Sequence, residues 1–320
     1  MKKTQWVAAA LAILFASAAF AQSDYPNKTI KIIAPVPAGS SADLLARIYA
    51  RGLQEKWGQS VMIENRVGAS HNIGADAVWR SAPDGYTLLT APPPSLAINK
   101  YLFPKLPYDP ETFVPVTVMA EVPNVLVVRQ GLGVDDVKGL IALARQKPGQ
   151  VTYASTGKGS TLHLAAEAFR NQAGVELLHV PYTGVPQLIT EMLAGRVDIT
   201  FVPLIDVYPY VTGGQLKALA VGTETRFAEL PDTPPLADTL PGYRATAWFA
   251  VALPPKAPMA LAEKLSAAIR EAFGRPEAAA LFKNLHGSPI LDTPAEAAAF
   301  IKADSERWKQ VILANKIDAE

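Results

Sequence analysis

Four short segments of the chain combine glycine, serine, threonine and proline in a way that suits the binding of an anion. They are Pro37-Ala38-Gly39-Ser40-Ser41, Pro92-Pro93-Pro94-Ser95, Ser155-Thr156-Gly157-Lys158-Gly159-Ser160-Thr161 and Tyr182-Thr183-Gly184-Val185-Pro186. Hydroxyl groups and the backbone N–H groups at a helix start can hold a carboxylate without a cationic side chain. Ser and Thr are also ordinary helix N-caps, so one such loop alone favours simple capping by about four to one. Four of them in corresponding positions favour a carboxylate site.

The motifs of several enzyme classes are absent. No GxSxG occurs, which argues against a nucleophile elbow. Gly159 separates Lys158 from Ser160, whereas a phosphate loop needs the hydroxyl residue directly after the lysine. We therefore expect a binding protein that is not an enzyme and uses no cofactor.

Metal ligands are also missing from the sequence. The chain has no cysteine, and its four histidines form no HxH, HxxxH or HExxH pattern. The sequence therefore predicts no metal site. His163 follows the third loop, where it would either donate a hydrogen bond to a ligand or pack against its own helix.

Strands and helices alternate along the chain and would position these loops. Short β-branched runs at 29–34, 61–63 and 87–90 alternate with helical apolar spacing at 44–57 and 73–79. The alternation resumes with strands at 124–129, 151–154, 176–180, 198–202 and 216–221 and helices at 134–144, 160–171 and 185–194. This pattern predicts two α/β units. In such sheets a ligand binds beyond the carboxyl ends of the strands, where the four loops fall.

The C-terminal part has a different pattern. After a strand at 247–253 it is mostly helical, with helices at 259–273, 277–285 and 294–315 and one short strand near Ile290. These helices need a sheet to pack on, and we expect the first unit to supply it. The chain would then cross between two lobes at 116–125 and 245–251. We predict lobe 1 from 22–123 and 247–320, lobe 2 from 124–246, and a two-strand hinge.

The first 21 residues have the pattern of a secretory signal peptide. Met1-Lys2-Lys3 is basic, Trp6 to Ala16 is apolar, and Ala19-Phe20-Ala21 suits signal peptidase. A membrane anchor is the weaker alternative, because the 16 residues from Trp6 to Ala21 fall short of the roughly 20 needed to span a bilayer. The formal net charge of +1 argues against a nucleic-acid binder. We expect a monomeric protein exported to the periplasm.

A further set of short blocks follows one another through the chain. They are Tyr25-Pro26-Asn27-Lys28, Glu64-Asn65-Arg66-Val67-Gly68-Ala69, Asn72-Ile73-Gly74, Ala82-Pro83-Asp84-Gly85-Tyr86-Thr87-Leu88-Leu89, Ala97-Ile98-Asn99, Lys105-Leu106-Pro107-Tyr108-Asp109, Pro123-Asn124-Val125-Leu126-Val127-Val128, Tyr153-Ala154-Ser155, His179-Val180-Pro181-Tyr182 and Pro241-Gly242-Tyr243. In this order they resemble the Bug-type solute-binding proteins of tripartite tricarboxylate transporters. The resemblance runs from about Tyr25 to the C-terminus.

The resemblance implies a two-lobed periplasmic-binding-protein fold, type II-like, that closes over a small carboxylate. It also implies delivery of that ligand to the membrane permease subunits of a transporter. In that family the ligand is held largely by backbone N–H groups, hydroxyls and bridging waters. The candidate ligand-binding residues of this chain are Pro37, Ala38, Gly39, Ser40, Ser41, Pro94, Ser95, Ser155, Thr156, Gly157, Ser160, Thr161, His163, Tyr182, Thr183, Gly184, Val185 and Val202.

The chain departs from the family pattern in ways that bear on the ligand. It has Gly39-Ser40 in place of Gly-Gly, and Pro92-Pro93-Pro94 in place of Ser, Thr or Gly residues. Many members carry an aspartate after the residue equivalent to Phe201, where it could pair with a ligand ammonium; this chain has Val202. The departures favour a carboxylate with an apolar or aromatic body over an amino acid.

Two alternatives to transport stay open at this point. The same receptor would fit a sensor kinase as its partner, and the sequence does not distinguish a kinase from a permease. A periplasmic hydrolase on this fold is a weaker alternative, because it needs a clustered base and nucleophile.

Overall fold

The computed structural model describes residues 25–318, so the predicted signal peptide at 1–21 lies outside the described residues. The strands are β1 (Ile30–Ala34), β2 (Val61–Asn65), β3 (Thr87–Ala91), β4 (Val114–Arg129), β5 (Thr152–Ser155), β6 (Leu178–Pro181), β7 (Ile199–Pro203), β8 (Leu216–Val221), β9 (Thr246–Leu253) and β10 (Ser288–Pro289). The α-helices are α2 (Ser41–Trp57), α3 (Asn72–Trp79), α4 (Asn99–Leu102), α5 (Val137–Gln146), α6 (Thr161–Ala173), α7 (Val185–Leu193), α8 (Leu204–Thr212), α9 (Met259–Phe273), α10 (Pro276–Asn284) and α11 (Pro294–Ala314).

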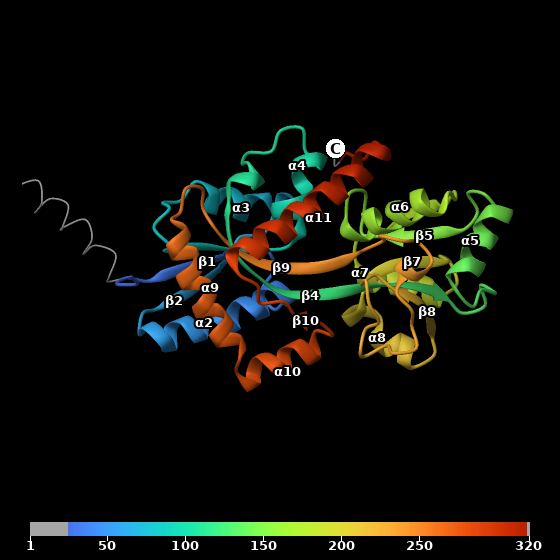
Figure 1. Ribbon diagram of the computed structural model, residues 1–320. Helices are drawn as coiled ribbons and strands as arrows, with labels where there is room; N and C mark the ends of the chain where they lie inside the picture. Colours follow the sequence, from blue (N-terminus) through green and yellow to red (C-terminus); the bar gives the residue numbers. More distant parts are fainter. Residues whose placement is uncertain (1–24, 319–320) are drawn as a thin grey trace, which may run out of the picture.

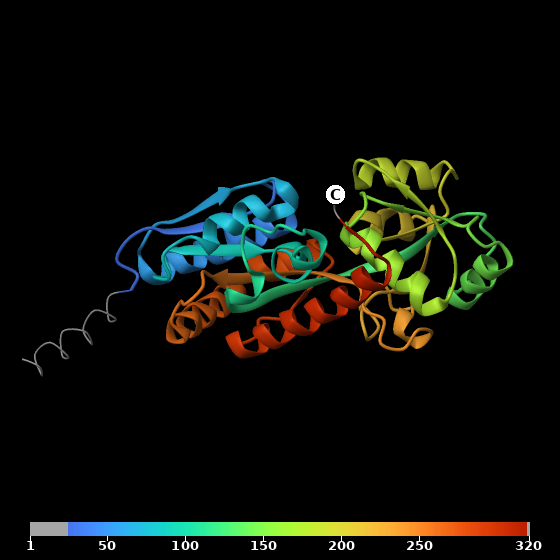
Figure 2. The same cartoon turned by 90° about the horizontal axis from the view of Figure 1, so that it is seen from above.

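These strands form one continuous sheet that runs through both halves of the molecule. Its order is β2-β1-β3-β9-β4-β7-β5-β6, and β8 and β10 also pair with β4. We call lobe 1 the part built on β1–β3, β9 and β10 with α2–α4 and α9–α11. We call lobe 2 the part built on β5–β8 with α5–α8. Figures 1 and 2 show the two lobes side by side, joined by β4 and β9.

The connection between the lobes is the antiparallel pair β4 and β9. The pairing runs from Val114 opposite Leu253 to Pro123 opposite Thr246. Beyond Pro123, β4 continues into lobe 2 and pairs there with β7 and β8. Both segments that the sequence suggested as crossings are therefore extended and paired. The residue boundaries proposed for the two lobes stay predictions.

Each lobe has hydrophobic clusters on both faces of its sheet. In lobe 1 the side chains of α2, α9 and α10 pack on one face, and those of α3, α4 and α11 on the other. In lobe 2 α5 and α6 cover one face, and α7 and α8 the other. The C-terminal helices pack on the sheet of the first unit, as expected from their lack of strands of their own.

Helix ends follow local sequence rules. Gly58 ends α2 in the left-handed conformation at φ 68°, a backbone state that glycine adopts without a Cβ penalty. The Ser160 hydroxyl caps α6 by accepting the N–H of His163. Thr293 and Glu296 form a reciprocal capping box at the start of α11. These caps fix where the loops between strands and helices begin.

The structure contains helical segments that the sequence pattern does not predict, including the short helix α4. Leu204–Thr212 forms α8, although Pro209 lies inside it and the sequence pattern predicts no helix there. The expected Pro92–Ser95 loop passes into a π-helical turn, Pro94–Ile98. In α8 tertiary packing outweighs the breaking effect of Pro209, because Leu204 and Val207 are buried in the core of lobe 2. Pro94 lies at the first position of its turn, where proline is tolerated.

Candidate functional site

The directions of the strands place the predicted loops on facing edges of the two lobes. β3 pairs antiparallel with β9, and β9 antiparallel with β4, so β1, β2 and β3 run in the direction of β4. That direction leads from lobe 1 into lobe 2, so their carboxyl ends face lobe 2. β7 runs against β4, and β5 runs parallel to β6 and β7, so their carboxyl ends face lobe 1. All four loops therefore follow strand ends that point toward the opposite lobe.

The first loop ends at the N-terminus of α2. No acceptor within residues 25–318 is found for the backbone N–H groups of Ser41, Ala42 and Asp43. The Ser40 hydroxyl oxygen at the N-cap is buried and has no hydrogen-bond partner there either. A helix start with unpaired N–H groups and an unpaired hydroxyl is suited to an anion.

Asp43 holds this loop in shape. Its carboxylate accepts hydrogen bonds from the Gly39 N–H at 2.9 Å, from Asn65 at 2.9 Å and from Arg47 at 2.8 Å. Burial alone would raise the pKa of the Asp43 carboxyl, but these hydrogen bonds hold that pKa below its ordinary value. Gly39 has φ 82°, so the turn also depends on glycine. Pro37 and Ala38 are exposed at its tip.

The second loop is buried deeper than the first. Ser95 is fully buried, and its hydroxyl oxygen has no hydrogen-bond partner in the described part of the chain. Its carbonyl accepts the Tyr108 hydroxyl at 3.0 Å. Pro94 begins the π-helical turn beside it. The Ser95 hydroxyl is thus a second unsatisfied polar group in lobe 1.

The third loop leads from β5 into α6. The N–H groups of Thr156, Lys158, Thr161 and Leu162 have no acceptor among residues 25–318. By contrast, the Gly157 N–H donates to the Ser155 hydroxyl at 3.1 Å, and the Gly159 N–H to Nδ1 of His163 at 3.3 Å. His163 is 5% exposed. The unpaired N–H groups again gather around a helix start.

The fourth loop precedes α7 and is tied to the third. The Tyr182 N–H donates to the Ser155 carbonyl at 2.9 Å. Thr183 donates its N–H and its hydroxyl to the side chain of Gln187. The N–H groups of Gly184, Val185 and Gln187 find no acceptor within the described residues.

Val202 occupies a different environment from the loops. It has no exposed surface and lies in the core of lobe 2 with Leu204 and Val207. Its side chain therefore supports the end of β7 from within the core and does not line a surface. The sequence had placed it among the candidate ligand-binding residues.

The third loop approaches lobe 1 directly. A Cβ added at Gly159 would lie 3.2 Å from a methyl carbon of Leu102 in α4. Lys158 pairs with Asp318 beyond α11 at 2.6 Å. Figures 1 and 2 both show α11 running from lobe 1 toward lobe 2. The loop that carries the most unpaired N–H groups therefore also contacts the opposite lobe.

A fifth loop, which is not among the loops predicted from the sequence, lies at the same edge of lobe 1. It follows β2, where Ala69, Ser70 and His71 have φ values of 46°, 51° and 76°. Non-glycine residues rarely adopt such angles, and strained backbone of this kind gathers at functional sites. Nδ1 of His71 lies 2.8 Å from the Pro35 carbonyl beyond β1. The position of this loop directly after a strand was the one sign of it in the sequence. Its left-handed backbone could not be predicted, because it depends on tertiary contacts such as that of His71 with Pro35.

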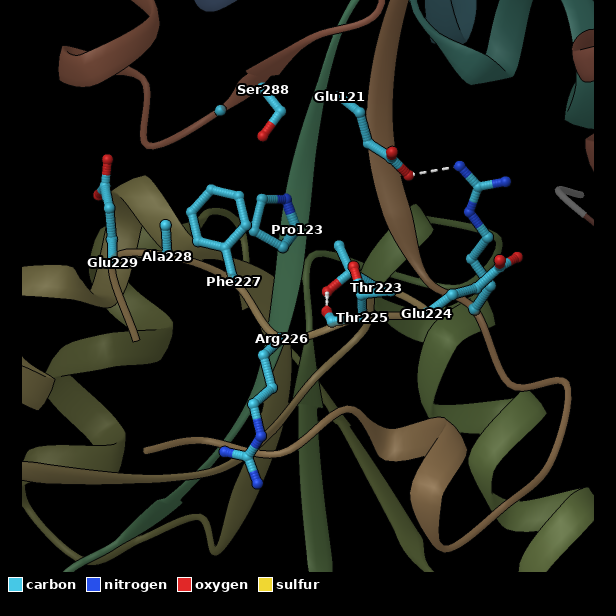
Figure 3. A pocket seen from close by; sticks show the side chains of 12 residues that line it. Glu121, Pro123, Thr223, Glu224, Thr225, Arg226, Phe227, Ala228, Glu229 and Ser288 are labelled. Atoms are coloured by element: carbon cyan, nitrogen blue, oxygen red, sulfur yellow. Dashed lines mark hydrogen bonds and ion pairs between the residues drawn. The ribbon is translucent and has the colours of Figure 1, made fainter. Parts of the chain in front are cut away.

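A cavity of about 540 Å³ lies beside the hinge and away from these loops. None of the candidate residues lines it, and its walls carry Glu121, Glu224 and Glu229. Arg244 pairs with Glu121 at 2.6 Å, and Arg226 donates to the Pro231 carbonyl, turning away from Ser288 and Glu121 (Figure 3). Since its cations are engaged and its carboxylates repel anions, this cavity does not suit a carboxylate.

Other site types find no support in the described part of the chain. Within residues 25–318, no three His, Asp or Glu side chains gather so as to hold a metal ion. Among the same residues, no helix has the length and apolar composition of a membrane span.

Comparison with known proteins gives consistent matches along the chain. The model of the family described as "Tripartite tricarboxylate transporter family receptor" matches residues 45–317. Protein BugT of Bordetella pertussis is 35% identical over 291 residues, covering 90% of this chain and 89% of that protein. A protein from the tcbD-tcbE intergenic region of Pseudomonas sp. strain P51 is 33% identical over 298 residues, covering 92% and 88%.

Solved structures give the same picture. Rpa4515 of R. palustris with adipate has a TM-score of 0.77 at 34% identity, covering 92% of this chain and 99% of that one. MatC of Rhodopseudomonas palustris with bound malate has a TM-score of 0.73 at 26% identity, covering 90% and 100%.

Proposed function

Because this chain belongs to the tripartite tricarboxylate transporter family of periplasmic receptors, which are not enzymes, we propose that it captures a small carboxylate between its two lobes. Two relatives of known structure, Rpa4515 and MatC, were solved with adipate and with malate, both of them carboxylates. In this proposal the third loop and the N-terminus of α2 grip the acid from opposite lobes. The bound receptor then delivers it to the permease subunits of a membrane transporter.

One observation carries this proposal: the unpaired N–H groups at the starts of α2, α6 and α7, on facing edges. The first N–H groups of a helix have no partner within the helix, so they bind another part of the protein, water or a ligand. Helix starts add the positive end of the helix dipole, which favours a negative ligand.

The charged side chains near these loops support the same conclusion. Lys158 pairs with Asp318, and Arg66 and Arg47 are bound to Glu64 and Asp43. Cations that are already neutralised offer little to a ligand. The carboxylate would therefore depend on backbone N–H groups, together with the buried hydroxyl of Ser40.

The proposal extends to the body of the ligand. Leu102 packs beside the third loop, and the prolines at 92–94 and Val185 supply no hydrogen-bond donors from their side chains. These neighbours favour an acid with an apolar or aromatic body. Export through the segment 1–21 and action as a monomer belong to the same proposal.

Proline substitution at the first helical residue tests the assignment. Proline is tolerated at that position because its missing N–H has no partner within the helix. Ser40 and Ser160 already have the extended backbone that a residue before proline prefers, with ψ values of 163° and 157°. Ser41→Pro and Thr161→Pro therefore each remove one N–H group from the proposed site and preserve the helix.

The measurement is calorimetric titration with adipate, malate, hexanoate, benzoate and aspartate. A hydrogen bond to a charged group contributes about 1.5–3 kcal/mol, so each proline variant should bind about 10- to 100-fold more weakly. The controls Ser41→Ala and Thr161→Ala keep the N–H and should stay within about threefold of the parent. If none of these acids binds the parent, or if the proline variants bind as the parent does, the proposal is wrong.

A further inference from the structure

Two histidines fix the conformation of the third loop through its two glycines. Nδ1 of His163 accepts the Gly159 N–H at 3.3 Å. Nε2 of His179 lies 2.6 Å from the Ser155 hydroxyl oxygen, which in turn accepts the Gly157 N–H at 3.1 Å. Gly157 and Gly159 have φ values of 113° and 78°, so the turn needs both glycines.

The two imidazole rings form one packed unit. Their centroids lie 4.5 Å apart, and the His179 ring stacks on Tyr153 at 4.8 Å and 18°. The Tyr153 hydroxyl donates to Glu167 at 2.6 Å, and Glu167 pairs with Arg170 at 2.9 Å. The rings are thus held in place from β5, β6 and α6 together.

We propose that His163 and His179 are positioning residues of the carboxylate site. His163 accepts the Gly159 N–H, and His179 holds the Ser155 hydroxyl that accepts the Gly157 N–H. The N–H groups of Thr156, Lys158, Thr161 and Leu162 are then left to the ligand. The inference rests on the proposed function. In this proposal His163 does not contact the ligand but affects its binding by holding the third loop. The proposal also adds His179, which was not among the candidate residues.

The proposed role requires His163 to be neutral, because a protonated Nδ1 cannot accept the Gly159 N–H. Burial, and then the nearby His179, Arg170 and Lys158, lower the pKa of His163 to about 4. The other titratable groups around the two rings are Tyr153 and Glu167. The loop is therefore intact at neutral pH and loses its Gly159 contact as the pH falls toward 4.

Amide hydrogen exchange tests this without any ligand. Asn at position 163 has an oxygen close to the position of Nδ1, whereas Leu has no acceptor there. We expect the Gly159 amide to exchange at least about tenfold faster in His163→Leu than in the parent and in His163→Asn. The Gly174 amide, which donates to Asn171 at the other end of α6, is the internal reference and should not change.

His179 gives a second pair of variants should His163→Leu fail to fold. His179→Leu should speed exchange at Gly157, and His179→Gln, which has an acceptor near Nε2, should not. At pH 4 the Gly159 protection factor of the parent should fall, and that of His163→Asn should persist. If His163 only packed in the core and did not accept the Gly159 N–H, the parent and His163→Asn would not differ in this response to pH. Equal protection of the glycine amides in all variants would overturn the proposal.

Adipate serves as the probe for the link to binding. His163→Leu should bind adipate at least about tenfold more weakly than the parent, and His163→Asn within about threefold. If adipate binds and His163→Leu binds it as tightly as the parent, the positioning role is wrong. If the parent does not bind adipate, the acid that it binds best in the titrations above replaces adipate as the probe. If it binds none of them, that result counts against the proposed function, and hydrogen exchange decides by itself whether the histidines hold the loop.

Discussion

The carbonyl oxygen of Ala245 lies where a side chain on Gly222 would begin: an added Cβ would stand 2.2 Å from it. The Gly222 N–H donates to the Asn124 carbonyl at 2.7 Å, and the Ala245 N–H to the Gly222 carbonyl at 2.9 Å. Gly222 thus joins the end of β8 to both strands that connect the lobes. The close approach of three backbones is possible only without a side chain there.

Gly222→Ala should therefore disturb the hinge. Forcing a methyl group into this contact separates the backbones and should lower the free energy of unfolding by about 1–3 kcal/mol. Urea denaturation measures the loss. Gly274→Ala is the matched control, since its added Cβ would lie 3.4 Å from the nearest atom at a normal φ of −73°. Equal stabilities of the two variants would contradict this account.

Asp304 pins α11 to the hinge strand β9. Its carboxylate is 5% exposed and accepts the indole N–H groups of Trp248 and Trp308, each at 2.9 Å. It also pairs with Arg307. Asp304→Ala leaves the two indole N–H groups without this acceptor and Arg307 without its carboxylate. It should lower the free energy of unfolding, measured with heat or urea, by about 3–5 kcal/mol. Glu306→Ala, an exposed neighbour, should change stability by less than about 0.5 kcal/mol; a similar loss in both variants would refute the assignment.

Asp206 makes stability depend on pH. Burial raises the pKa of its carboxyl to about 6 from an ordinary 3.8, and no hydrogen bond or ion pair of its side chain is found within residues 25–318. The folded protein therefore retains a proton that the unfolded chain has released between these pH values. Stability should fall as the pH rises from about 4 to 6, and the full cost should persist at pH 7.

Asp206→Asn removes this cost. The variant should be more stable than the parent by about 1–2 kcal/mol at pH 7, a figure reduced for the partial exposure of the group. The difference should vanish below pH 3.8, where the Asp206 carboxyl is protonated in both the folded and the unfolded parent. Asp232→Asn, at an exposed position, should show no such pH dependence. Urea denaturation at several pH values measures the difference in the free energy of unfolding between Asp206→Asn and the parent. If that difference is the same at all pH values, this explanation is wrong.

His286 links the lobes outside the proposed site. Its ring, on the segment between α10 and β10, stacks on Tyr208 of α8 at 4.0 Å and 24°. Its Nδ1 also contacts the Glu229 carboxylate in lobe 2. We expect His286→Ala to broaden the distribution of distances between the lobes, because a stacking contact and a hydrogen bond between them are lost.

Spin labels can measure this, since the chain has no cysteine of its own. Cysteines at the exposed positions Glu263 in α9 and Lys138 in α5 would carry one label in each lobe. Lys283→Ala, at an exposed residue of α10, is the control and should leave the distribution as in the parent. The same distribution for His286→Ala would show that this contact does not restrain the lobes.

The sequence determined the repeated order of strand, loop and helix. Helix α9 has the predicted bounds, and the run at 29–34 became β1 with one residue fewer. Local patterns suffice there because apolar spacing and helix stops act over a few residues. The hydroxyl-rich loops were visible for the same reason, and they suggested a carboxylate as the ligand. The family resemblance was visible in the same blocks, and the family comparison confirms it.

Only the tertiary structure decided which groups in those loops are already engaged. Sequence could not assign the Gly159 N–H to His163 or the Gly157 N–H to Ser155, because these bonds depend on how β5, β6 and α6 pack. It also could not show that Lys158 is paired with Asp318, 160 residues away. Hydrogen bonds between distant segments form only once the chain has folded. The groups that remain for a ligand are therefore a property of the fold and not of any one segment.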